Sequence, residues 1–139
     1  MVISLIGLDA DDTLWHSESH FAVTETRFQQ LLGQWHGPDD LAAKLLERER
    51  TNLRIFGYGI KGFTLSMIET AIEVSGGRVS AAAIDEIIGW GKEMLDHPVE
   101  HLPGVSETID ALSASHRLAL ITKGDLFHQE SKIAESADA

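Results

Sequence analysis

The chain opens with an apolar segment that has the pattern of a buried strand. Residues 2–8 (VISLIGL) are almost all apolar, include β-branched side chains and show no alternation between apolar and polar positions. Such a run is typical of a strand in a parallel sheet, where both faces are covered by other elements. We therefore predict a strand at the start of the chain that is buried on both faces.

The middle of the chain has a helical pattern instead. Apolar side chains recur three or four positions apart in four segments, which we predict as helices. The first spans residues 19–35 and the third about 64–74, the second carries Leu41, Leu45 and Leu46, and the fourth carries Ile84, Ile87, Ile88 and Leu95. Asp39 or Asp40 is expected to cap the second helix, and Ser80 the fourth. Residues 56–63 (FGYGIKGF) contain three glycines, which disfavour both helix and strand, so we predict a loop there.

Helix and strand patterns alternate again after residue 96. A connector with two prolines spans residues 97–105, a short helix follows, and residues 117–122 (RLALIT) repeat the buried-strand pattern before a last helix over 126–135. The expected order is therefore strand, four helices, connector, helix, strand, helix. Two similar strands far apart in sequence predict an α/β fold with a parallel sheet that is interrupted by a helical insertion.

Composition and charge exclude several classes of function. The 139 residues include 22 acidic residues against 11 Lys plus Arg, which gives a formal net charge of -11. Nucleic acids and anionic membranes attract basic proteins, so we expect neither as a partner. The absence of cysteine excludes disulfides and thiolate metal sites. The N-terminal segment lacks the features of a signal peptide and no apolar run has membrane-spanning length, so we expect a cytoplasmic location.

Candidate chemistry follows the first strand directly. Asp9, Asp11 and Asp12 come after the apolar run, and Thr122 ends the second predicted strand. Ligands of open parallel sheets bind at the carboxyl ends of the strands, which share one edge, so Asp9, Asp11 and Thr122 are expected to converge. Carboxylates in such a place need a compensating charge, and a metal ion can provide it. On spacing alone, a solvated turn or a helix cap explains the aspartates equally well.

These motifs together resemble those of the haloacid dehalogenase-like (HAD) hydrolases. DADDTL at residues 9–14 matches the D-x-D-x-T pattern of that family, and it follows an apolar strand. Residues 102–125 (LPGVSETIDALSASHRLALITKGD) resemble the second motif, in which a Pro-Gly turn leads through a helix to a strand ending in Thr or Ser. The resemblance implies a partial Rossmann-like parallel sheet, the HAD core, formed by residues 1–16 and 98–139, with an inserted α-helical cap over residues 17–97.

The resemblance also implies a Mg²⁺-dependent phosphohydrolase that acts on a small phosphorylated metabolite through an aspartyl-phosphate intermediate. Asp9 resembles the nucleophile, and Asp11 resembles the general acid and base. The Asp9 carboxylate and the backbone carbonyl of Asp11 would bind Mg²⁺, which prefers oxygen ligands. An acid at position 11 indicates the phosphatases and phosphomutases of the family, because dehalogenases release a halide that needs no proton.

Further residues are implied to bind the phosphate group or the substrate. Thr13 resembles the threonine that orders the loop, and the Thr122 hydroxyl would hold a phosphate oxygen with the backbone N–H groups of Lys123 and Gly124. Lys61, in the Gly-rich segment, is a candidate for a specificity residue that reaches the site from the cap. A solvated loop lysine explains Lys61 equally well.

Two parts of the family pattern have no match in the sequence. These are the catalytic lysine of a third motif and the acidic residues of a fourth, since only residues 126–139 follow Asp125. Lys132 lies within the last predicted helix and is not expected to replace the missing lysine. We therefore expect a chain that ends early. The alternative function is a catalytically incompetent fragment or pseudoenzyme with a binding role, which self-associates through an exposed edge of the sheet.

Overall fold

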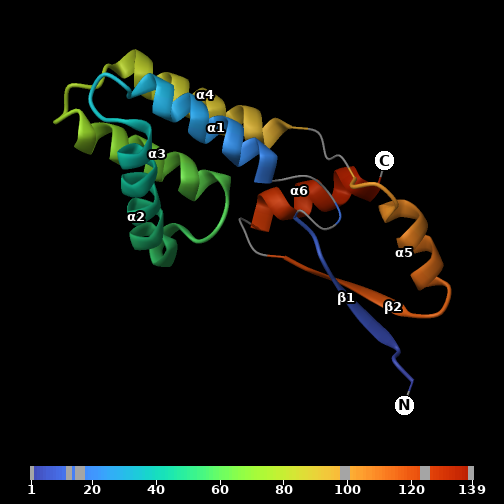
Figure 1. Cartoon of the computed structure of the whole chain (residues 1–139). Coiled ribbons are helices and arrows are strands. Elements are labelled where there is room, and N and C mark those ends of the chain that lie inside the picture. Colours follow the sequence, from blue (N-terminus) through green and yellow to red (C-terminus); the bar gives the residue numbers. More distant parts are fainter. Residues whose placement is uncertain (1, 12–13, 15–17, 98–100, 123–125, 138–139) are drawn as a thin grey trace.

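The computed structural model describes residues 2–11, 14, 18–97, 101–122 and 126–137. Its elements are β1 (Leu5–Asp9), α1 (Glu18–Leu31), α2 (Pro38–Phe56), α3 (Ile60–Val74), α4 (Ala81–Asp96), α5 (Val105–Ser113), β2 (Arg117–Ile121) and α6 (Leu126–Ala137) (Figure 1). This order is the one that the sequence predicts, and the α/β class is confirmed. Among the described residues, no helix is both long enough and apolar enough to cross a membrane.

The two strands form a parallel pair. Leu5 lies opposite Arg117, and Asp9 lies opposite Ile121, so that the carboxyl ends of β1 and β2 meet at one edge. The pairing is extended by the Arg117 N–H, which donates to the Ser4 carbonyl at 2.8 Å. The parallel arrangement is the one that the sequence predicts. It places the residues that follow the two strands next to each other.

Neither strand is buried on both faces, which corrects the prediction made from the apolar run. Leu5 is 55% exposed and Ile121 is 63% exposed. Helix α5 packs against β2, and a small core lies where β1 ends, formed by buried Ala10, Leu14 and Val105 with Leu8, Leu102 and Ile109 against it. An apolar run predicts a strand correctly, but its burial depends on which other elements cover the sheet. Self-association through this exposed sheet stays a prediction.

The larger core lies among helices α1–α4. Helix α3 packs against both α2 and α4, and α1 contacts both α2 and α4. The fully buried apolar residues of this core include Phe28, Leu32, Leu41, Leu45, Met67 and Ile87. Figure 1 shows these four helices grouped at one end of the molecule, with the strands, α5 and α6 at the other. The helices fall within the range predicted for the cap, and the division into cap and core stays a prediction.

The first two helices have different ends from those predicted. Helix α1 ends at Leu31 and not at Trp35. Helix α2 begins at Pro38 with Gly37 as its N-cap, so Asp39 and Asp40 lie in the first turn and do not cap the helix. Proline suits the first helical position because its fixed φ angle is already helical and its missing N–H would have no partner there. Acidic residues stabilise the first turn through the helix dipole.

Helix α3 begins earlier than predicted, and this moves Lys61 from a loop onto a helix. The loop is confined to the residues around Gly57 and Gly59, whose φ angles of 71° and 127° favour glycine. The Phe63 N–H already donates to the Gly59 carbonyl at 3.1 Å. The predicted cap of α4 is confirmed, because the Ser80 hydroxyl accepts a hydrogen bond from the Ala83 N–H at 3.0 Å.

Helices α3 and α4 approach each other closely at Gly91. A Cβ atom added there would lie 2.4 Å from Thr64 Oγ1 and 3.3 Å from Thr64 Cβ. Gly89, on the same helix, has open space around it. We expect Gly91→Ala to have a free energy of unfolding about 1–3 kcal/mol lower than that of Gly89→Ala, because overpacking forces the two helices apart. Urea denaturation of both variants measures this difference.

Gly89→Ala is the matched control for this close approach. Both substitutions add the same methyl group to the interior of the same helix, where Ala is favoured over Gly by about 0.5–1 kcal/mol. Gly89→Ala is therefore expected to be slightly more stable than the unmodified protein. Equal stability of the two variants would show that α3 and α4 do not touch at Gly91.

Candidate active site

The candidate site lies where the two parallel strands end. Asp9 is the last residue of β1 and is exposed, Ala10 is fully buried, and Asp11 is partly exposed. The Leu14 N–H donates to the Ala10 carbonyl at 2.8 Å, which turns the chain over the end of the strand. Ala10 therefore anchors this segment in the small core beside Val105. The two aspartates flank this anchor at the edge of the sheet.

Helix α6 holds the side chain of Asp11. Lys132 Nζ lies 2.6 Å from Asp11 Oδ1, and Gln129 Nε2 donates to Asp11 Oδ2 at 3.3 Å. The side chains of Lys132 and Asp11 are 13% and 29% exposed, and Gln129 is 5% exposed. A hydrogen bond between two charged groups is short and strong, and partial burial protects it from screening by salt. Both carboxylate oxygens of Asp11 are thus fixed by one helix.

The spacing of Gln129 and Lys132 explains why one helix can reach both oxygens. Residues three positions apart lie on the same face of a helix. Helix α6 begins four residues after Thr122, so its first turns lie close to the edge where the strands end. Neither Lys132 nor Gln129 is assigned to the site from the sequence. Their Q-x-x-K spacing places both side chains on one face of a helix, but it does not specify which distant residue they contact.

The remaining phosphate-binding candidates are only partly placed. Thr122 directly follows β2 and is half-buried, one residue beyond the pairing of Asp9 with Ile121. Thr122 therefore lies at the same edge of the sheet as Asp9, where both strands end. Thr13, Lys123 and Gly124 lie outside the described residues. Convergence of these groups on one phosphate stays a prediction.

Lys61 faces the same helix that holds Asp11. It lies in the first turn of α3, and its Nζ is 5.8 Å from the centroid of the Phe127 ring on α6. This separation is within the range of a cation–π contact. The start of α3 therefore lies beside the start of α6 (Figure 1). A role of Lys61 in substrate selection stays a prediction.

The donors at the end of β1 fit a magnesium ion in chemical type. The Asp9 carboxylate and the Asp11 backbone carbonyl are oxygen donors, which Mg²⁺ prefers. Since the side chain of Asp11 is engaged with Lys132 and Gln129, the backbone carbonyl is the donor that this residue would offer. The described residues include no cluster of three or more His, Asp or Glu side chains suited to a metal. Water and phosphate oxygens commonly complete the coordination of Mg²⁺.

One solved structure is closely similar to this chain. It is a haloacid dehalogenase-like family hydrolase from Xanthomonas campestris, with 50% sequence identity and a TM-score of 0.89. The match covers 96% of this chain and 56% of the other, so this chain spans little more than half the length of that protein. No protein-family model matches the sequence, and no curated protein does.

Two other solved structures are more distant. An L-2-haloacid dehalogenase from Xanthobacter autotrophicus has 14% identity and a TM-score of 0.52, over 98% of this chain and 53% of the other. At this identity the likeness shows a shared fold alone. A predicted phosphoglycolate phosphatase from Haemophilus somnus 129pt has 18% identity and a TM-score of 0.48, over 91% of this chain and 54% of the other. That likeness is too weak to support an argument.

Proposed function

Because the chain belongs to the haloacid dehalogenase-like superfamily of hydrolases, we propose that it acts as a Mg²⁺-dependent phosphohydrolase on a small phosphorylated metabolite. The observation that carries this proposal is the pair of aspartates at the end of β1, of which Asp11 has an oriented carboxyl group. Asp9 lies at the edge of the sheet, and Asp11 is held by Lys132 and Gln129. A phosphate ester needs an acid to protonate its leaving oxygen, whereas a halide leaves without a proton. An oriented acid at position 11 therefore favours phosphate esters over haloacids.

The proposed reaction has two steps. Asp9 attacks the phosphorus atom, the bond from phosphorus to the leaving oxygen breaks, and Asp11 donates a proton to that oxygen. Asp11 then accepts a proton from a water molecule, whose oxygen attacks the phosphorus, frees Asp9 and releases phosphate. A bound Mg²⁺, held by the Asp9 carboxylate and the Asp11 carbonyl, would neutralise the charge of the phosphate.

Positioning is the main contribution that the described residues make to this chemistry. Phosphoryl transfer depends on orientation and on electrostatic stabilisation. Lys132 and Gln129 donate to the two oxygens of the Asp11 carboxylate, which limits its rotation and suits the form that accepts a proton from water in the second step. In the first step Asp11 carries its proton on Oδ2, which then no longer accepts from Gln129, while Oδ1 keeps its contact with Lys132. We assign Lys132 and Gln129 as positioning residues in the proposed reaction. The match covers 56% of the similar hydrolase. The activity and the substrate of the whole protein are therefore proposed here.

A comparison of two reactions tests the proposed function. We expect the protein to release p-nitrophenolate from p-nitrophenyl phosphate with Mg²⁺, to lose this activity with EDTA, and to recover it with excess Mg²⁺. We expect no release of chloride from L-2-chloropropionate. Chloride release without phosphatase activity would contradict the proposal. Absence of both activities would favour the alternative binding role.

A further inference from the structure

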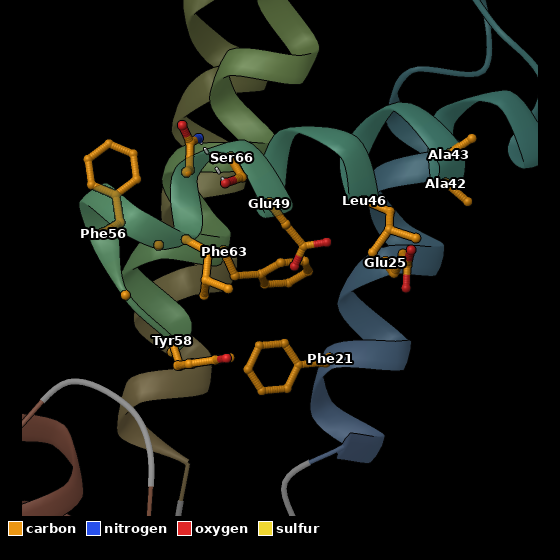
Figure 2. Close-up of a pocket in the computed structure, with 15 residues that line it drawn as sticks. Phe21, Glu25, Ala42, Ala43, Leu46, Glu49, Phe56, Tyr58, Phe63 and Ser66 are labelled. Atoms are coloured by element: carbon orange, nitrogen blue, oxygen red, sulfur yellow. Dashed lines mark hydrogen bonds between the residues drawn. The ribbon is translucent and has the colours of Figure 1, made fainter.

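The four-helix group contains a pocket that is lined by none of the residues placed in the proposed reaction. It has a volume of about 580 Å³ and lies between α1, α2 and the start of α3 (Figure 2). Pockets of this size bind small organic molecules. We call it the α1–α3 pocket and define it by Phe21, Glu25, Leu46, Glu49, Tyr58 and Phe63 among its lining residues.

The walls of the α1–α3 pocket are mainly apolar and aromatic. The rings of Phe21 and Phe63 are tilted by 57° with their centroids 5.1 Å apart, which joins α1 to α3. Tyr58 lines the pocket from the loop between α2 and α3, and Leu46 lines it from α2. Figure 2 shows the ring of Tyr58 near that of Phe21. A ligand with an apolar or aromatic body fits these walls.

All the charged side chains that line the pocket among the described residues are negative. Glu25 on α1 and Glu49 on α2 are both partly exposed, and none of the described lining residues is Lys, Arg or His. Figure 2 shows the Glu49 carboxylate pointing toward the rings of Phe21 and Phe63. Apolar walls lower the local dielectric constant and strengthen the attraction between a carboxylate and a cation. Aromatic faces also attract ammonium groups.

The rest of α2 and α3 provides a rigid wall for the pocket. Arg48 donates to Glu69 at 3.1 Å and to Glu73 at 2.8 Å. Asn52 Nδ2 donates to Ser66 Oγ at 3.1 Å beside the pocket. The hydrogen bond from Arg48 lowers the pKa of Glu73 below its usual value, opposed by partial desolvation. Arg48 on α2 thus joins the two helices through Glu69 and Glu73 on α3.

We propose that the α1–α3 pocket binds an organic ammonium ion with an apolar or aromatic body. Charge complementarity and the aromatic walls select this class over anions, which the two carboxylates repel. The phosphate group of a substrate is excluded from the pocket for the same reason. The ammonium group therefore belongs either to the alcohol part of a phosphate ester or to a separate amine. Binding of the alcohol part of a phosphate ester rests on the proposed function, whereas binding of a separate amine does not.

Binding by a simple amine tests the pocket without any catalysis. We expect phenethylamine to raise the melting temperature and to show saturation transfer in ligand-observed NMR, whereas 3-phenylpropionate does neither. Glu49→Gln and Glu25→Gln are each expected to weaken phenethylamine binding by about three- to tenfold, because each removes one partly solvated charge. Glu47→Gln, on the same helix but outside the pocket, is the matched control and is expected to bind normally.

Three outcomes would overturn the proposal. They are no binding of phenethylamine, equal binding of the carboxylate, and amine affinity that neither substitution changes. Circular dichroism of each variant shows whether its fold is intact. The two independent variants keep the test valid if one of them does not fold.

A phosphate ester of tyramine separates the two sources of the ammonium group. If the pocket holds part of the substrate, Glu49→Gln raises KM for tyramine phosphate but not for phenyl phosphate, and phenethylamine competes with the former. If the ligand is a separate amine, phenethylamine binds without competing. Both results support the pocket. If the protein binds the amine but hydrolyses no phosphate ester, the proposal for the α1–α3 pocket is supported and only the proposed function is contradicted.

Discussion

Replacing Asp9 by Asn is expected to lower kcat/KM for p-nitrophenyl phosphate by about a thousandfold or more. The amide has nearly the same shape as the carboxylate but cannot act as the nucleophile, and loss of a nucleophile commonly has an effect of this size. Asp9 is exposed at the end of β1, so the substitution is expected to leave the fold intact. Steady-state kinetics with Mg²⁺ measure the loss. Acid quenching with labelled substrate tests whether a phosphoryl group remains on the protein.

Asp110→Asn is the matched control for this substitution. Asp110 is exposed on α5, and its replacement makes the same change of charge. We expect its kinetics to equal those of the unmodified protein and only the Asp9 variant to lose the labelled intermediate. Retention of a tenth or more of the activity by Asp9→Asn would show that Asp9 is not the nucleophile.

Replacing Lys132 by Met is expected to lower kcat/KM for an alkyl phosphate by about a hundredfold, and for p-nitrophenyl phosphate much less. The contact of 2.6 Å from Lys132 to Asp11 orients the acid that protonates the leaving oxygen. General acid catalysis contributes about 10²- to 10⁴-fold, and an alkoxide needs it more than p-nitrophenolate does. Met retains most of the apolar stem of Lys, so packing is largely preserved. The ratio of kcat/KM for the two substrates measures the effect.

Three further variants make this prediction specific. Asp11→Asn is expected to show the same selective loss on alkyl phosphates. Lys132→Arg keeps the charge and is expected to recover part of the activity, because the planar guanidinium fits the site less well. Lys92→Met, exposed on α4, is the matched control and is expected to change neither rate. Equal losses on both substrates would indicate a structural role for Lys132 and not a positioning role.

Much of the fold follows from local patterns in the sequence. The order of strands and helices, the parallel pairing and the Ser80 cap all agree with the prediction. Each depends on the spacing of apolar residues or on a side chain that bonds to its own backbone a few positions away. The errors at the local level are at helix ends. Pro38 set the start of α2, and α3 began at Ile60 in spite of the neighbouring glycines.

The candidate site follows in part from the sequence and stays a prediction. The aspartates and Thr122 are indicated because a strand and the polar residues after it are adjacent in sequence, and parallel pairing brings the ends of β1 and β2 to one edge of the sheet. The contact from Lys132 to Asp11 joins residues 121 positions apart, and no local pattern specifies such a pair. It depends on how α6 packs against the end of the sheet.

The sequence by itself therefore determined the elements, their order and the carboxylates at the end of β1. Only the tertiary structure decided that Leu5 and Ile121 are exposed, that side chains of α6 bind the Asp11 carboxylate, and that the α1–α3 pocket forms. The physical reason is that backbone conformation responds to neighbours within a few residues, through propensity, capping and hydrophobic periodicity. Burial and side-chain contacts respond to the surfaces that distant elements present to one another, and these surfaces exist only once the chain has folded.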